Sequence, residues 1–467
     1  MKTKSICRAG DLAGDRIGDQ PRGLMEKIVW KPIGDLRPFP DNPRRHPQQQ
    51  ITRLMKSIRL TWTNPILIDE RCTILAGHGR FEAAKRLGMK EVPTITISGL
   101  KDEEKRAVLI ADNRIPERAI WDFDLLRLHF ENLIEIDFEV ELSGFSTGEI
   151  DFVLDGKPAN SDPADKISGV ARDGPAVSQV GDCWELSRHR IICGSALCAD
   201  HYHRLLGDEV AELVIASPPS ASSAMLQAYG YGKRGRIDQR GRELAAGETR
   251  AAEHRGSLEE FIRLTIRHSH DGSIHFIFTD WSGLLELLNA ARPLYSEWKN
   301  LLVWSKRNAG RGSFYNPAHE LVAAFKSGSG AHIQNFGTAE RGRARTNLLE
   351  YPEAGGHVRS RDRQNHFPAK PVALVADLMR DCSRRNSLIL DPFGGAGTTI
   401  LAAERTSRRA RVIELNPLLV DLAVRRWQQM SGMTARHMES GLPFAERDAQ
   451  QIATRLPTAP KTKPRAT

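Results

Sequence analysis

Residues 388–414, LILDPFGGAGTTILAAERTSRRARVIE, constrain the fold of this chain more than any other stretch. Three apolar residues lead to Asp391, a turn with three glycines follows, and Thr398 opens a helical pattern. A second apolar stretch then ends at Glu414. A strand, a glycine turn, a helix and a further strand are typical of a doubly wound, mostly parallel sheet. Glycines let the backbone approach a ligand and the helix start offers free N–H groups, so the pattern predicts a ligand site.

Three kinds of ligand suit such a turn. A phosphate-binding loop has a lysine directly before its Ser or Thr, where Gly397 stands here. A dinucleotide fingerprint has a third glycine three residues after the second, where this chain has Ile400. S-adenosyl-methionine has no pyrophosphate and needs an acid near the turn and another for its ribose, which Asp391 and Glu414 fit. The alternative without a ligand is a turn that only packs.

A second stretch, LVIASPPSASS at residues 213–223, ends an apolar run with Ser217, Pro218, Pro219 and Ser220. Proline has no N–H and a fixed φ, so a proline pair does not continue a sheet ladder. The pattern predicts a short buried strand that passes into a rigid loop. By itself such a loop is also an ordinary way to end a strand.

Together these motifs resemble the DNA amino-methyltransferases, which modify adenine N6 or cytosine N4. The resemblance rests on DPFGGAGTT, ELNP, NHFPAKP and a strand that ends in SPP. The SPP element comes first, as in the circularly permuted (β) class. The resemblance spans residues 179–432 and implies S-adenosyl-L-methionine as cofactor. The implied cofactor-binding residues are Asp391, Phe393, Gly395, Gly397, Thr398 and Glu414, with Lys370 and Ser195 at the edges of the site.

The resemblance also assigns the proline loop to catalysis on a base flipped out of the duplex. Ser217 and the carbonyl of Pro218 are expected to accept the two amino hydrogens, while Pro219 and Ser220 shape the base pocket. Serine in the first position is typical of cytosine-N4 enzymes. Ser220 stands where the family carries an aromatic ring that stacks on the base, and Ser195 stands where permuted members have an aspartate.

We therefore expect a site-specific DNA methyltransferase that moves a methyl group from S-adenosyl-methionine to cytosine N4 or adenine N6. The alternative, based on the SPPS loop, is a catalytically impaired homologue that acts as a DNA-binding protein.

Residues 26–115 resemble the ParB-like fold shared by partition proteins and sulfiredoxin, through PDNPRRH, QITRLMKSI, NPILIDE, ILAGHGRFEAAKRLG and ADNR. The loop Gly-Glu-Arg-Arg, with which partition proteins bind cytidine triphosphate, reads Gly77-His78-Gly79-Arg80 here. His78 and Arg80 at a helix start are expected to bind a DNA phosphate. The module is expected to be an auxiliary DNA-binding or specificity domain. A rival hypothesis makes it the active part, as a nuclease or nucleotide-binding switch.

The formal charge of +9 favours a polyanionic partner, nucleic acid first. We expect double-stranded DNA, with a homodimer as one possible assembly. The six cysteines form no CxxC pair, so no metal is expected, and neither a signal peptide nor a membrane span is recognisable. These features favour a cytoplasmic, nucleoid-associated protein. Arginines suit phosphates and guanine edges, and the expected DNA-contacting ones are Arg341, Arg343, Arg345 and Arg361.

The expected fold class is α/β, a doubly wound Rossmann-like methyltransferase sheet preceded by a small α+β ParB-like domain. The expected segments are a flexible leader (1–25), the ParB-like domain (26–115), a helical connector and linker (116–178), the methyltransferase domain (179–432) and a loose basic tail (433–467).

Overall fold

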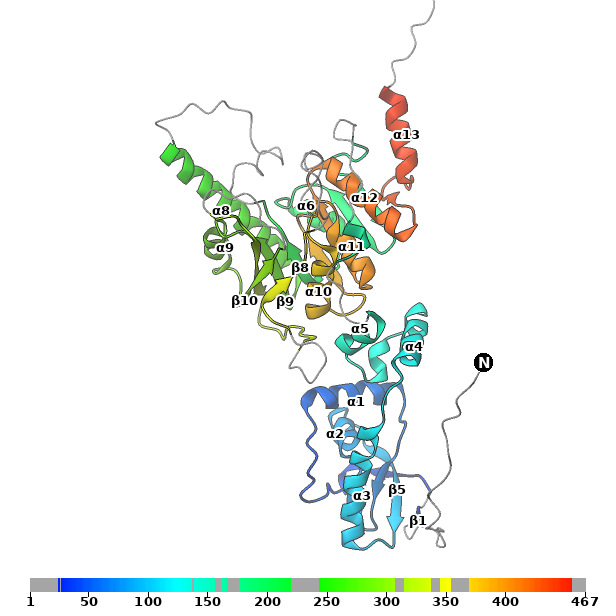
Figure 1. Cartoon of the computed structure of the whole chain (residues 1–467). Coiled ribbons are helices and arrows are strands. Elements are labelled where there is room, and N and C mark those ends of the chain that lie inside the picture. Colours follow the sequence, from blue (N-terminus) through cyan, green and yellow to red (C-terminus); the bar gives the residue numbers. More distant parts are fainter. Residues whose placement is uncertain are drawn as a thin grey trace, which may run out of the picture. The chain divides into compact units, whose positions relative to one another are not determined.

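The computed structural model describes residues 24–25, 27–136, 138–155, 161–165, 176–219, 243–306, 315–336, 345–353 and 369–455 (Figure 1). The chain divides into two compact units, residues 1–146 and 147–467, and each is described by itself. In the described ranges, no helix combines the length and the apolar character that crossing a membrane requires.

The first unit is a small α+β module. Its strands are β1 (Leu24–Met25), β2 (Val29–Pro32), β3 (Ile66–Ile68), β4 (Ile74–Ala76) and β5 (Glu91–Ser98). Its helices are α1 (Gln48–Leu60), α2 (His78–Arg86), α3 (Asp102–Arg114) and α4 (Phe123–Glu135), with the short 3-10 helices η1 (Ile33–Asp35), η2 (Pro116–Arg118) and η3 (Val140–Ser143). The strands pair in the order β1-β5-β3-β4, with β2 also on β5. Buried Ile66, Ile68, Ile74 and Val92 form a core on this sheet, which confirms the expected module.

The second unit is built on a mixed sheet whose described strands follow the order β12-β10-β11-β9-β8-β13-β14-β7-β6-β15. These strands are β6 (Cys183–Leu186), β7 (His189–Cys193), β8 (Ala211–Ala216), β9 (Ser269–Thr279), β10 (Glu297–Ser305), β11 (His319–Lys326), β12 (Leu348–Glu350), β13 (Leu388–Asp391), β14 (Arg409–Glu414) and β15 (Arg436–His437). The adjacent strands β9, β8, β13, β14 and β7 are parallel. Their carboxyl ends therefore leave the sheet together, along what we call the carboxyl edge.

Helices cover both faces of this sheet, as a doubly wound fold requires. The described helices of the unit are α5 (Thr147–Asp155), α6 (Ala199–Leu206), α8 (Glu243–Arg267), α9 (Leu284–Ala291), α10 (Val372–Cys382), α11 (Thr398–Arg405), α12 (Pro417–Ser431) and α13 (Phe444–Arg455), with the 3-10 helix η4 (Pro163–Asp165). One buried cluster unites the sheet with α10, α11 and α12, and another unites it with α6, α8 and α9. This arrangement confirms the expected fold class.

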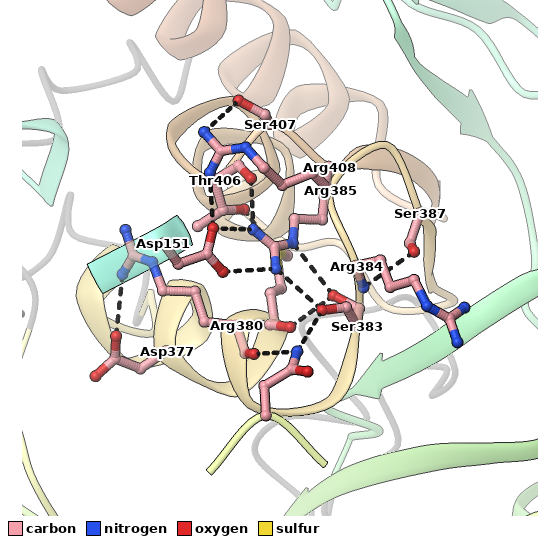
Figure 2. Close-up of polar contacts among 12 residues, drawn as sticks. Asp151, Asp377, Arg380, Ser383, Arg384, Arg385, Ser387, Thr406, Ser407 and Arg408 are labelled. Atoms are coloured by element: carbon pink, nitrogen blue, oxygen red, sulfur yellow. Dashed lines mark hydrogen bonds and ion pairs between the residues drawn. The ribbon is translucent and has the colours of Figure 1, made fainter. Parts of the chain in front are cut away.

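Helix α5 belongs to the second unit through a buried ion-pair network (Figure 2). The Asp151 carboxylate accepts hydrogen bonds from Arg408 at 3.0 and 3.2 Å and from Arg385 at 2.7 Å. Burial opposes ionisation of Asp151, but the two guanidinium groups outweigh it and lower its pKa. Linker composition predicts a domain start at 179, whereas the compact unit starts at 147 because α5 docks ahead of the Gly/Pro-rich stretch.

Residues 433–455, the described part of the expected tail, contain a strand and a helix that pack on the sheet. Strand β15 pairs with β6, and the Phe444 ring packs against Trp184 with centroids 5.0 Å apart. Arg447 donates to both carboxylate oxygens of Asp182, at 2.8 and 3.0 Å. The strand has two residues, which is too short for a periodic pattern, so it could not be predicted from the sequence.

Candidate active site

The glycine turn and the proline loop leave the sheet from adjacent strand ends. Strands β13 and β8 run parallel, with Leu390 opposite Val214, and neighbouring strands lie about 4.8 Å apart. The turn begins at Asp391, at the end of β13, and the loop begins at Ser217, directly after β8. Both therefore stand at the carboxyl edge. Residues 217–219 are half-buried, and Ser220 lies outside the described residues.

The next two strands add two more predicted residues to this edge. Glu414 ends β14 opposite Cys193, which ends β7. Ser195 follows two residues after Cys193, and its hydroxyl oxygen accepts the N–H of Leu197 at 3.2 Å. The Ser195 N–H lies 2.9 Å from Nδ1 of His201. Ser195 is thus held in a local turn next to Glu414.

The glycines of the turn serve different purposes. A Cβ added to Gly394 would lie 2.2 Å from Cγ1 of Val412, and one added to Gly397 would lie 2.5 Å from Cβ of Ala423. These two glycines let the turn pack against β14 and α12. Gly395 has a φ of +52°, and no described atom lies within 4 Å of the position that its Cβ would take. The turn is therefore open at Gly395, where a ligand can approach.

Asp391 and Glu414 are the two buried acids of the site, 5% and 1% exposed. Asp391 accepts the N–H of Phe393 at 2.9 Å and the hydroxyl of Thr399 at 2.5 Å. Glu414 accepts the N–H of Gly395 at 2.7 Å. Both carboxyl groups thus hold the backbone or the helix start of the turn.

Their surroundings favour a positively charged ligand. Burial raises the pKa of Asp391 to about 6. Burial, together with the charge of Asp391, raises the pKa of Glu414 to about 7. A cation beside these carboxyl groups stabilises their ionised forms, because opposite charges attract most strongly where water is excluded. The open turn and the two acids therefore fit a ligand that carries a sulfonium and an ammonium group.

Phe393 is half-buried and packs on helix α8. Its ring meets Phe261 of α8 edge to face, with centroids 5.1 Å apart, and joins the buried cluster beneath the turn. The contact anchors the turn to α8.

Lys370 joins the site through an ion-pair network that the sequence did not reveal. Its ammonium lies 3.0 Å from a carboxylate oxygen of Glu320 and 5.0 Å from the ring centroid of Phe278. Lys306 pairs with the same glutamate at 2.6 Å. The carbonyl of Lys370 accepts the hydroxyl of Thr398 at 3.2 Å. Glu320 stands in a β-strand with no motif around it, so only the fold identifies it.

A segment upstream of the sheet also reaches the site. Asp165 of η4 accepts the N–H of Val372, the first residue of α10, at 2.8 Å. Arg426 donates to the carbonyl of Ala396 in the glycine turn at 2.5 Å and to that of Ala164 at 2.9 Å. The segment thus holds both the glycine turn and the helix that follows Lys370.

Arg345, one of the expected DNA contacts, forms ion pairs within the protein. Its Nε donates to both oxygens of Asp381, at 3.1 and 3.0 Å, and its Nη2 lies 2.7 Å from Asp377. The guanidinium is paired with two acids of α10, 32 and 36 residues later in the chain. The other three expected arginines, Arg341, Arg343 and Arg361, lie outside the described residues.

His78 and Arg80, the two expected phosphate-binding residues of the first unit, differ in their charge and in their hydrogen-bond partners. Nε2 of His78 accepts the N–H of Phe39 at 3.1 Å. Burial and the nearby His46 lower the pKa of His78 to about 4, so the ring is neutral at neutral pH and offers no positive charge. Nε of Arg80 is buried and has no hydrogen-bond partner among the described residues. A neutral ring whose Nε2 accepts carries its proton on Nδ1, so His78 offers a neutral donor and only the Arg80 guanidinium offers a charged one.

Three family models match the chain. A ParB N-terminal domain matches residues 20–114, a ParB-methyltransferase HTH domain matches 124–180, and a DNA methylase of the N6/N4 type matches 211–425. The HTH range contains α4 and α5, where the sequence predicted a helical connector. The DNA methylase range contains the proline loop, the glycine turn and Glu414.

Individual relatives match parts of the chain. Over 81 residues it is 49% identical to the ParB-like nuclease domain-containing protein YnaK of Escherichia coli K12, covering 17% of this chain and 93% of that protein. Over 87 residues it is 34% identical to the type II methyltransferase M.ScaI of Streptomyces caespitosus, covering 18% and 29%. Among solved structures, the cytosine-N4-specific PvuII DNA methyltransferase is 16% identical with a TM-score of 0.38, covering 56% and 91%. The chain belongs to the ParB-like family in its N-terminal domain, which it joins to a DNA methylase domain of the N6/N4 type.

Proposed function

We propose that this protein transfers a methyl group from S-adenosyl-L-methionine to the exocyclic amine of a DNA base, cytosine N4 or adenine N6. The observation that carries the proposal is that Ser217 and the open glycine turn leave the sheet at the carboxyl edge from adjacent parallel strands. Methyl transfer requires the bound methyl donor and the bound amine to lie close together.

The glycine turn and its acids are proposed to hold the cofactor, which supplies an electrophilic methyl group on its sulfonium. The open side at Gly395 admits it, and the buried carboxyl groups of Asp391 and Glu414 stabilise its positive charge and its ribose hydroxyls. Lys370, fixed by Glu320, lines the adjoining edge.

The proline loop is proposed to orient the target amine. The lone pair of an amine on an aromatic base is delocalised into the ring, so the amine is a weak nucleophile. Acceptance of its two hydrogens by the Ser217 hydroxyl oxygen and the Pro218 carbonyl directs the lone pair toward the glycine turn. Proline suits this role because its fixed φ aims the carbonyl and it has no N–H of its own.

Tritiated methyl transfer to a mixed pool of DNA, followed by nucleoside analysis, tests the proposal. We expect label in N4-methylcytosine or N6-methyladenine, and its loss in Ser217→Ala. Calorimetry with the cofactor separates the alternative, since an impaired homologue binds the cofactor and labels no nucleoside. In that case Ser217→Asp combined with Ser220→Tyr is expected to restore transfer.

The same assay addresses the finer features of the proposal. We propose that the substrate is double-stranded DNA, which places the protein at the nucleoid, and that two copies of the chain associate. Parallel reactions on duplex and single-stranded pools test the first point, and light scattering of the purified chain tests the second.

A further inference from the structure

A rigid turn presents an exposed tryptophan at the end of β9. Oδ1 of Asp280 accepts the N–H groups of Ser282 and Gly283, at 3.0 and 2.8 Å. A Cβ added to Gly283 would lie 2.8 Å from the hydroxyl oxygen of Thr279, so the turn closes tightly on the strand end. Within this fixed backbone, the side chain of Trp281 is 73% exposed.

This turn stands beside the proline loop. Strand β9 runs parallel to β8, with Ile277 opposite Ala216, the last residue of β8. Strand β9 extends two residues beyond this pair, to Thr279, so residues 217–219 and the turn at 280–283 both leave the sheet at the carboxyl edge from adjacent strands. Phe278, three residues before Trp281, lies under the ammonium of Lys370, which connects the end of β9 to the proposed cofactor side as well.

The exposed indole of Trp281 supplies an aromatic ring that the proline loop, with Ser220 in its fourth position, does not have. The base whose amine is held by Ser217 and Pro218 has left the duplex, so it no longer stacks on the neighbouring bases. Stacking on an aromatic side chain is worth about 1–3 kcal/mol per base. The fourth residue of this loop is Ser220, which has no ring. Large aromatic side chains are usually mostly buried, so an exposed indole at the carboxyl edge, on the strand adjacent to that of the amine acceptors, offers a surface for stacking.

We propose that Trp281 provides the aromatic surface on which the extruded target base stacks, in place of a ring at position 220. The inference rests on the proposed function, because it takes a flipped base as the ligand of the carboxyl edge. It makes Trp281 a residue that contacts the substrate and contributes to its binding, with no part in holding the cofactor.

Three variants of the full chain test this role: Trp281→Ala, Trp281→Phe and the matched control Trp298→Ala. Trp298 is also exposed, at 45%, but stands near the start of β10. Because β10 and β9 both run antiparallel to β11, that start lies at the opposite edge of the sheet. DNA affinity is measured by fluorescence anisotropy on labelled duplex and single-stranded pools, and methyl transfer is measured on the same pools.

We expect Trp281→Ala to lose about 5- to 150-fold in DNA affinity or in kcat/KM, the equivalent of one stacked base. Trp281→Phe is expected to retain most of the DNA affinity and most of the kcat/KM. Trp298→Ala is expected to match the wild type in both quantities. Cofactor affinity and the melting temperature stay unchanged, because the indole is exposed. The slope of log affinity against log salt also stays unchanged, because stacking releases no counterions.

Wild-type affinity and transfer in Trp281→Ala overturn the inference, as does a salt slope that falls with affinity. A wild-type chain that binds DNA without transferring methyl groups overturns the proposed function alone, since the affinity comparison still reports on Trp281.

Discussion

The carboxylate of Glu414 accepts the amide hydrogen of Gly395 across 2.7 Å, and this contact joins the end of β14 to the open side of the glycine turn. The glutamate is 1% exposed, and burial with the charge of Asp391 raises its pKa to about 7. The contact places an acid that titrates near neutral pH beside the proposed position of a cationic ligand.

The raised pKa of Glu414 predicts that cofactor affinity depends on pH. The folded protein without cofactor holds this proton more tightly than the unfolded chain, so its stability falls as pH rises from about 4.5 to about 7. A cationic cofactor prefers the ionised carboxylate. Its affinity is therefore expected to rise with pH, by up to about tenfold per unit, and to level off above about 7.

Calorimetry between pH 5.5 and 8.5 measures this dependence, with buffers of different ionisation enthalpy to count the released protons. Glu414→Gln is expected to bind more weakly and to flatten the upper part of the profile, leaving the part due to Asp391, whose pKa is about 6. A wild-type affinity that does not change with pH contradicts the assignment.

Alanine substitutions at Gly395 and Gly397 are expected to differ in how they divide their effect between protein stability and cofactor affinity. In Gly397→Ala the new methyl group overlaps Ala423, and the backbone at a φ of +76° is left-handed as well, so we expect a loss of about 2–5 kcal/mol in the free energy of unfolding. Gly395→Ala meets no described atom and costs about 1–2 kcal/mol for its left-handed backbone, but its methyl group enters the ligand side.

Urea denaturation and cofactor calorimetry on both variants separate the effects. We expect Gly395→Ala to lose more cofactor affinity than Gly397→Ala for the same loss of stability. Equal cofactor affinity in Gly395→Ala and the wild type excludes a ligand at the open side of the turn.

The Asp151–Arg408 pair predicts a large stability effect far from the carboxyl edge. Asp151→Ala leaves the fully buried guanidinium of Arg408 without its carboxylate, which costs about 3–5 kcal/mol. The matched control, Glu259→Ala, removes the exposed partner of Arg263 on α8 and is expected to cost less than about 1 kcal/mol. Calorimetric melting of the full chain measures both, and similar effects in the two variants refute the anchoring role of α5.

Substitution of Asp165, which lies outside the residues that match the DNA methylase model, is expected to lower the cofactor affinity. Its carboxylate takes the place of a helix cap for α10, and removal of a cap costs about 0.5–2 kcal/mol. In Asp165→Ala the start of α10 loosens and Lys370 shifts, so cofactor affinity falls. Asp165→Asn keeps an acceptor and is expected to restore most of it. Calorimetry measures the cofactor affinity of both variants. A wild-type affinity in Asp165→Ala contradicts the prediction that Asp165 positions Lys370.

Local patterns in the sequence were enough to place the strand ends of the site. The glycine turn follows β13 and the proline pair follows β8, because apolar runs and backbone breakers act over a few residues. Partners far apart in the chain left no such signal. Arg408 meets Asp151 across 257 residues, and Arg345, expected at DNA, pairs instead with acids of α10. Glu320 likewise became visible only when the fold brought it to Lys370.

The strand order has a consequence for how the protein is made. Strands β7 and β8 follow each other in the chain, yet β14 and β13 lie between them in the sheet. A nascent chain that has emerged from the ribosome only as far as residue 387 therefore lacks both of the strands that separate β8 from β7. Long-range pairing of this kind is slow to form, because its loops must close first. The carboxyl edge is complete only after β14, which ends at Glu414, has been synthesised, so a chain that stops before residue 388 lacks both acids of the proposed site.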